Sequence, residues 1–165
     1  MNTDLTSVFS LDFYSDPNAV NRILSCNDET SYYGLSLTPQ DAAALMKTRE
    51  EELRFNGRVE VGSETIIKLI EAFCDSSYIT QNDYAETLQQ LIEIFYGAKT
   101  ETEDRISDDE LIAFLRNSFE TRCGGSLEAL YERDVQKLAE NLRSGVKDYT
   151  NMNPDEEETE EEYDE

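Results

Sequence analysis

The sequence predicts a mainly α-helical protein, a compact bundle of about six helices. Helix-start signals recur along the chain, each a Ser, Thr or Asp followed by a proline at the first helical position or an acid at the third. The apolar residues behind these signals repeat at three- and four-residue spacing, which is typical of helices that bury one face. With 165 residues, 38% of them hydrophobic, the chain is long enough for one domain with a proper core.

Prolines open the first two expected helices. Pro17 begins a short helix over residues 17–26, whose apolar face carries Ile23. Pro39 begins a longer helix that ends at Gly57, because glycine readily adopts the left-handed conformation that reverses the chain after a helix.

Two short segments around the second helix have an extended pattern. Apolar residues alternate over 32–37 and again over 58–61, where Val59 and Val61 are the alternating pair. These segments are candidates for a small two-stranded ribbon.

Four further helices are expected, with starts at Ser63, Thr80, Ser107 and Ser126. The helix after Ser63 is the most apolar, so we expect it to lie at the centre of the packing. Ser107 and Glu110 form the cleanest capping box, in which each side chain bonds to the other residue's backbone N–H. The last helix is expected to break around residues 132–134 and to stop at Gly145.

The chain divides into one domain and a tail. Residues 1–150 are expected to form a single helical domain, with an N-terminal helical arm over 1–31 and a folded body over 32–145. Residues 151–165 are expected to be a disordered acidic tail, since nine of the last eleven residues are acids that repel one another.

The charge balance and the lack of histidine exclude several functions. The 37 acids against 14 bases give a net charge of −23, and the chain without its last eleven residues still carries −14. Such a body is unsuited to direct binding of nucleic acid or an anionic membrane. With no histidine, the usual general base and the commonest transition-metal ligand are missing, and no common nucleotide, zinc or hydrolase motif occurs. We therefore expect a non-enzyme without catalytic residues or cofactor.

The three cysteines indicate a reducing compartment. Cys26, Cys74 and Cys123 are odd in number and far apart, with no paired spacing. The N-terminus has no apolar run of signal-peptide length, and no eighteen apolar residues stand together. The expected location is the cytoplasm.

One stretch resembles a degenerate calcium loop between two helices. Glu101, Glu103, Ser107 and Glu110 would take the third, fifth, ninth and twelfth positions of an EF-hand loop, and they are weak metal candidates. Lys99 would stand where the first carboxylate belongs, and no glycine stands at the sixth position. A pair of helical hairpins with capping boxes explains the pattern better.

Two pairs of residues are candidate contact residues. Tyr32 and Tyr33 lie next to a polar loop and could form an exposed patch, although such a pair often splits between core and surface. Arg122 and Cys123 precede two glycines at a helix end, where Arg122 would favour the thiolate. The interpretation of Cys123 as a small packed hydrophobe at a glycine-based helix stop is preferred.

Five segments together resemble a known family. They are 34–38, 56–62, 69–74, 106–111 and 122–127. The chain is similar over residues 32–143 to a family of small acidic bacterial proteins of unknown function. The resemblance implies a bacterial cytosolic protein that accompanies another, larger protein, and it implies no activity, cofactor or catalytic residue.

We interpret the chain as a non-catalytic cytosolic protein-binding or adaptor module, with another protein as its partner and no direct contact to nucleic acid or membrane. Two alternatives stay open. The first is an acidic mimic of nucleic acid that inhibits a protein with a basic groove. The second is a carboxylate-based metal-binding protein with a degenerate EF-hand-like loop. The sequence marks neither the partner's identity nor the oligomeric state.

Overall fold

The computed structural model describes residues 16–152, which are mostly helical and contain no β-strand. The predicted mainly helical fold with six principal helices is confirmed. Residues 153–165 of the acidic tail expected over 151–165, and residues 1–15 of the expected arm, lie outside the described residues. The first two residues of the expected tail are placed: Asn151 accepts a hydrogen bond from Asn141, and Met152 is buried. The principal helices, in chain order, are α2 (Pro17–Ser25), α4 (Pro39–Phe55), α5 (Glu64–Phe73), α6 (Tyr84–Glu101), α7 (Asp108–Thr121) and a last one made of α8 (Leu127–Ala129), the π-helical η3 (Leu130–Val135) and α9 (Gln136–Arg143). Three short turns of helix, α3 (Asn27–Thr30), η1 (Ser31–Tyr33) and η2 (Gln81–Asp83), connect them.

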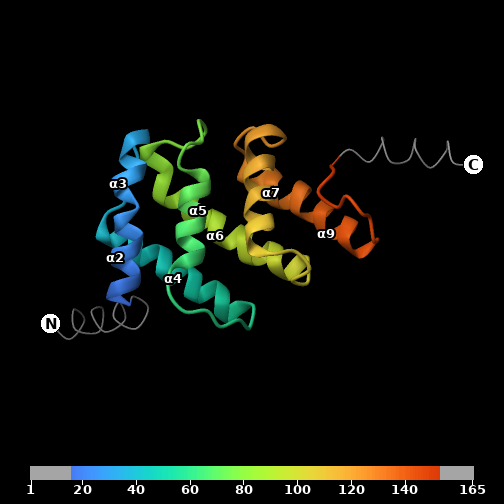
Figure 1. The fold of residues 1–165 in the computed structure, drawn as a ribbon, viewed down its shortest axis with the longest axis horizontal. Coiled ribbons are helices and arrows are strands. Elements are labelled where there is room, and N and C mark those ends of the chain that lie inside the picture. Colours follow the sequence, from blue (N-terminus) through green and yellow to red (C-terminus); the bar gives the residue numbers. More distant parts are fainter. Residues whose placement is uncertain (1–15, 153–165) are drawn as a thin grey trace, which may run out of the picture.

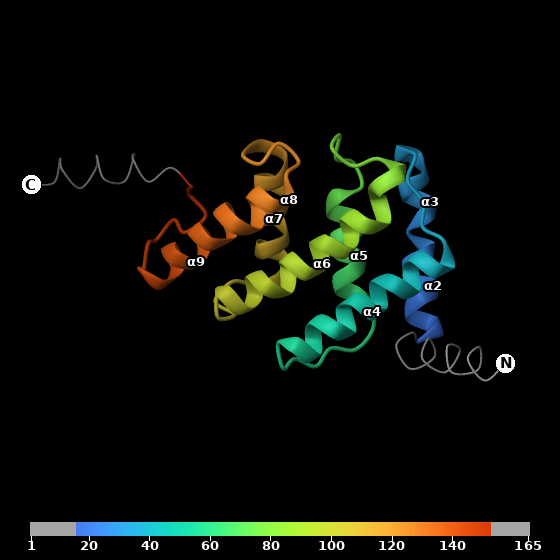
Figure 2. The same cartoon turned by 180° about the vertical axis from the view of Figure 1, so that it is seen from behind.

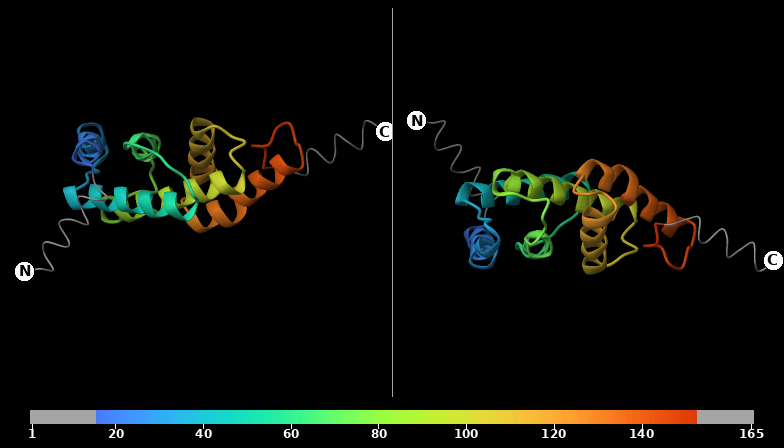
Figure 3. Two further views of the ribbon diagram at one scale, coloured as in Figure 1. Left: turned by 90° about the horizontal axis from the view of Figure 1, so that it is seen from below. Right: turned by 90° about the horizontal axis from the view of Figure 1, so that it is seen from above.

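The helices form three pairs stacked in a row (Figure 1). The first pair is α2 with α4, the second α5 with α6, and the third α7 with η3 and α9. In the first layer α2 packs on α5 and α5 on α7, and in the second layer α4 packs on α6 and α6 on η3 and α9. Figure 3 shows the first layer end-on and the second layer lengthwise. Stacked helix pairs of this kind are the arrangement of helical repeat proteins, which present long binding surfaces.

Helix α6 joins the three pairs. It contacts α4, α5, α7, η3 and α9, and Figure 2 shows it between α4 and α9. Apolar residues on more than one of its faces are buried, among them Leu91, Phe95 and Tyr96. Helix α5 is buried as expected and lies in the same middle pair, where Phe73 packs edge-on against Phe119 of α7.

The predicted caps are present at Ser107 and Ser126, whereas the Ser63 side chain makes no capping hydrogen bond. The capping box expected at Ser107 is half formed, because the Glu110 carboxylate accepts from the Tyr149 hydroxyl and does not bond back to Ser107. The Ser107 hydroxyl accepts a hydrogen bond from the Glu110 backbone N–H at 3.2 Å, and the Ser126 hydroxyl accepts one from the Ala129 N–H at 3.2 Å. The expected break in the last helix is the π-helical η3. Gly125 is required where α7 ends, because its φ is +84° and a Cβ there would lie 2.6 Å from the Tyr78 ring.

The predicted ribbon of 32–37 with 58–61 is wrong, because other partners take the backbone hydrogen bonds of these segments. The Leu37 N–H donates to the Asn27 side chain at 2.9 Å, and the Ser36 N–H donates to the Gln81 side chain at 2.8 Å. The second segment leaves α4 in a tight turn, with the Arg58 N–H donating to the Leu53 carbonyl. The first segment is therefore not free to pair with the second, whose Val59 and Val61 side chains are exposed.

No helix between residues 16 and 152 combines the length and the hydropathy needed to span a bilayer.

Candidate functional site

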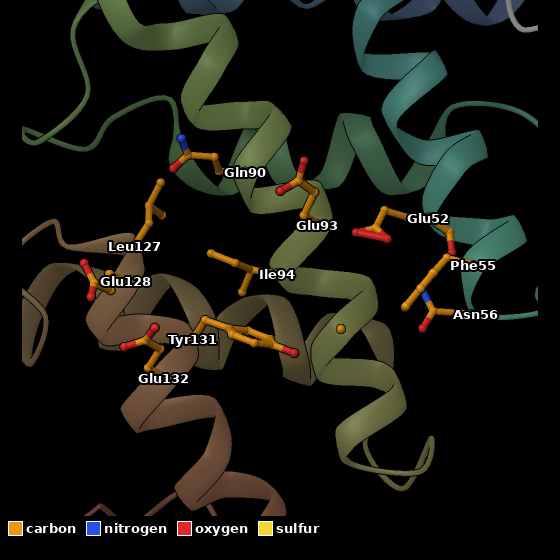
Figure 4. A pocket seen from close by; sticks show the side chains of 11 residues that line it. Glu52, Phe55, Asn56, Gln90, Glu93, Ile94, Leu127, Glu128, Tyr131 and Glu132 are labelled. Atoms are coloured by element: carbon orange, nitrogen blue, oxygen red, sulfur yellow. The ribbon is translucent and has the colours of Figure 1, made fainter.

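One hollow of the described surface is a groove across the second layer. Its volume is about 550 Å³, within the range of ligand sites. All three pairs contribute to it: the C-terminal end of α4, the middle of α6, and the α8–η3 segment (Figure 4). We call this hollow the α6 groove; it is lined by Glu52, Phe55, Asn56, Gln90, Glu93, Ile94, Gly97, Leu127, Glu128, Tyr131 and Glu132.

The floor of the α6 groove is apolar. Ile94 lies between α6 and η3, and the Tyr131 ring lies against α6 (Figure 4). Gly97 permits this approach, because a Cβ at that position would lie 3.0 Å from two atoms of the Tyr131 ring system. Phe55 at the end of α4 is 86% exposed, so its ring is available to a ligand in the groove.

Four carboxylates surround this floor. Glu52 and Glu93 face one another between α4 and α6, and Glu128 and Glu132 stand on the α8–η3 side (Figure 4). No ion pair or side-chain hydrogen bond engages any of the four within residues 16–152, and no basic residue is among the described residues that line the groove. The rim of the groove is therefore negative, and its four acids form no ion pair within the described residues.

Partial burial and the negative charge of the rim raise the pKa values of two groups in the groove, Glu52 and Tyr131. Partial burial, followed by the charges of Glu93 and Glu51, raises the pKa of Glu52. Partial burial, followed by the charges of Glu101 and Glu52, raises the pKa of Tyr131. The C-terminal end of α4 adds the negative end of its helix dipole. The arrangement suits a ligand that carries positive charge beside an apolar surface.

A family model described as a family of unknown function (DUF6323) matches residues 22–148. The chain belongs to this family. The matched region contains every residue of the α6 groove, and the resemblance noted from the sequence is confirmed at the level of an uncharacterised family. No curated protein and no solved structure matches the chain.

The DUF6323 chain places Tyr32 and Tyr33 together on η1, after α3. Both are exposed, at 86% and 49%, and their rings meet edge-on with centroids 5.1 Å apart. The pair does not split between core and surface. It lies in the first helix pair, away from the residues that line the α6 groove.

Arg122 and Cys123 belong to a half-exposed cluster around the buried Asp134. Asp134 is fully buried in η3; its carboxylate accepts from Arg133 Nε at 2.8 Å and lies 3.4 Å from Arg122 Nε. The Cys123 thiol donates to the same carboxylate at 3.6 Å. Burial, followed by the Asp134 charge, raises the pKa of the Cys123 thiol to about 11. The thiol is therefore protonated at neutral pH, which agrees with the preferred interpretation of Cys123 as a packed residue.

Three of the four weak metal candidates make other contacts. Ser107 caps α7, Glu110 accepts from the Tyr149 hydroxyl at 2.7 Å, and Glu103 pairs with Arg105 at 3.5 Å. Glu101 ends α6. Among the described residues, no three acidic or cysteine side chains gather so that they could hold a metal ion.

Sequence reasoning missed the α6 groove. Glu93 lies off the apolar stripe of α6, on one face with Gln90 and Gly97, and this pattern is typical of an ordinary solvated helix surface. Phe55 is the sequence feature that could have indicated the groove, because this aromatic residue lies off the apolar face of its helix, close to the glycine that ends it. No local pattern joins these positions to Tyr131.

Proposed function

We propose that this protein is a non-catalytic cytoplasmic binding module whose α6 groove contacts a positively charged segment of another protein. The observation that carries the proposal is the gathering of Glu52, Glu93, Glu128 and Glu132 around an apolar floor, with no lysine or arginine among the described residues that line the groove. Like charges held together disfavour the folded state, and a partner that brings positive charge removes this cost.

The stacking of helix pairs supports the proposal. Each pair supplies one wall or the floor of the groove, so the surface exists only in the assembled stack. Helical repeat proteins commonly use such composite surfaces to hold protein segments. The apolar floor with its charged rim also has the layout of protein interfaces, whose centres are apolar and whose edges are polar.

The test is affinity purification from native cells with variants of equal charge. The groove variant is Glu52→Gln with Glu93→Gln. The matched control is Glu29→Gln with Glu71→Gln, two exposed glutamates on α3 and α5 in the first layer. A chain ending at Asn153 serves as a third bait and removes the acidic segment.

A partner retained by the unmodified chain, the control and the shortened chain, and lost by the groove variant, is the expected result. Equal retention of the partner by the groove variant would show that the partner binds a surface other than the α6 groove, and would contradict the proposal. Retention of basic proteins that disappears with the acidic segment would leave only nonspecific attraction, and the proposal would fail.

A further inference from the structure

The α6 groove continues past its main hollow. A second hollow of about 410 Å³ shares Gln90, Leu127 and Glu128 with it and extends toward the start of α6. Tyr78, 46% exposed, stands at the far end of this second hollow. The two hollows therefore adjoin one another along α6, and we call them together the channel.

One face of α6, together with Asp83 at the end of η2, forms the base of this channel. Asp83, Glu86, Gln90, Glu93 and Gly97 follow at three- and four-residue spacing, and each lines one or both hollows. At a rise of 1.5 Å per residue, the face is about 21 Å long. An occupant helix of about 14 residues has the same length.

Apolar groups stand at both ends of the channel and at its middle. Phe55 and Tyr131 lie at one end, Leu127 at the middle and Tyr78 at the other end. Acids flank them, and among the described residues that line either hollow there is no lysine or arginine. A ligand with an apolar stripe and cationic residues on both sides of the stripe would match this distribution. Its long basic side chains would cover apolar surface with their stems and reach the acids with their charges.

The walls of the channel discriminate between a helix and an extended segment. They consist mostly of helical residues from α4, α6, α7, α8 and η3, whose backbone groups are engaged within the helices. An extended peptide gains affinity by pairing its backbone with an open edge, which these walls do not supply. A helix satisfies its own backbone and needs only side-chain contacts.

We propose that the occupant of the channel is a basic amphipathic helix of a partner protein, lying along α6 with its apolar stripe on Phe55, Leu127 and Tyr131. This inference rests on the proposed function and adds the conformation and chemistry of the partner segment. The channel's acids bind the basic flanks, and the exposed aromatic rings bind the stripe.

The experiment uses designed peptides and the full chain. The probe is a peptide of roughly 16 leucine and lysine residues with leucines at i, i+3, i+4 and i+7, labelled for fluorescence anisotropy. A peptide of the same composition in scrambled order, a version with two central prolines and spermidine are the comparisons. Circular dichroism measures peptide helicity, and backbone NMR shifts locate the contact.

The expected result is binding of the amphipathic peptide with a gain of helicity and shifts at Gln90, Gly97 and Leu127. Gln90→Arg should weaken binding at least about tenfold, since a like charge then faces the basic flank. Asn117→Arg, an exposed substitution on α7, should leave it within about twofold.

Equal binding of the scrambled or proline-containing peptide would contradict the proposal that the occupant of the channel is an amphipathic helix. Competition by spermidine at similar affinity would do the same, because charge alone would then suffice. Both outcomes leave the proposed function standing if the native partner is still lost from the Glu52→Gln, Glu93→Gln bait. Retention of that partner by the groove variant is the separate result that would remove the proposed function itself.

Discussion

Removal of the Asp134 carboxylate should destabilise the protein strongly, because this charge ties the end of α7 to the last helix. One oxygen accepts from Arg133 Nε at 2.8 Å, and the other lies 3.4 Å from Arg122 Nε. A hydrogen bond to a charged group contributes about 1.5–3 kcal/mol, and breaking a buried pair costs about 3–5 kcal/mol. The Arg122 and Arg133 side chains are 36% and 52% exposed, so both regain water when they are released. We therefore expect Asp134→Ala to lose about 2–3 kcal/mol, the lower part of these ranges.

Urea denaturation measures this loss as a lower midpoint at unchanged slope. The matched control is Asp109→Ala, which removes an 80% exposed partner of Lys68 at 2.8 Å. An exposed pair contributes no more than about 1 kcal/mol. Equal losses for the two variants would refute the argument that Asp134 holds the two helices together.

The reactivity of the Cys123 thiol gives a second readout of the same cluster. Since the Asp134 charge helps to raise the thiol pKa, Asp134→Asn should lower that pKa toward its ordinary value. The disulfide-exchange rate at pH 8 should rise about threefold for each unit that the pKa falls. Ile23→Val in α2 loses about 0.5–1.5 kcal/mol without touching this cluster, so it separates electrostatics from general loosening. Peptide mass spectrometry measures the exchange rate at Cys123. An unchanged rate in Asp134→Asn would contradict the conclusion that the Asp134 charge raises the pKa of this thiol.

Three further predictions test the groove and the core. The raised pKa of Glu52 means that the folded state binds its proton more tightly, so stability falls as pH rises from the unfolded pKa through the folded one. Glu52→Gln should add about 0.3–0.5 kcal/mol at pH 7, allowing for solvent screening, and almost nothing at pH 4; urea titrations at both values check this. Gly97→Ala gains about 1 kcal/mol of helix propensity but presses on Tyr131, so we expect a net change within about 0.5 kcal/mol, with displaced Tyr131 ring signals by NMR. Phe73→Ala removes a fully buried ring packed on Phe119 and should cost about 3–5 kcal/mol in a thermal melt.

Helix positions were predictable from the sequence because their signals are local. The Ser107 cap needs only Glu110 three residues later, and Pro39 fixes the first turn of α4 wherever the helix lies in the protein. The absence of the ribbon was not predictable in the same way. Asn27 and Gln81 supply the hydrogen bonds that a second strand would have made, and both come from elsewhere in the chain.

The candidate site depended on contacts that no local pattern encodes. Glu52 and Glu93 meet only because α4 packs along α6, and Tyr131 reaches α6 only because position 97 is glycine. The burial of Asp134 could not be predicted from the sequence for the same reason. Its arginine partners lie on two segments, and an isolated aspartate in a helix is more often a solvated residue.

The composite origin of the α6 groove gives a consequence for stability. In a stack of repeats each pair contacts mainly its neighbours, so a ligand that touches one pair stabilises that pair and little else. A helix lying in the channel contacts α4, α6 and the α8–η3 segment at once, and it therefore links all three pairs. Such a ligand stabilises the folded state by RT ln(1 + [L]/Kd), or about 2.7 kcal/mol at a hundredfold excess over Kd. Hydrogen exchange should accordingly slow in the first and third pairs together when the amphipathic peptide binds. Protection confined to α6 would mean that the peptide does not span the channel.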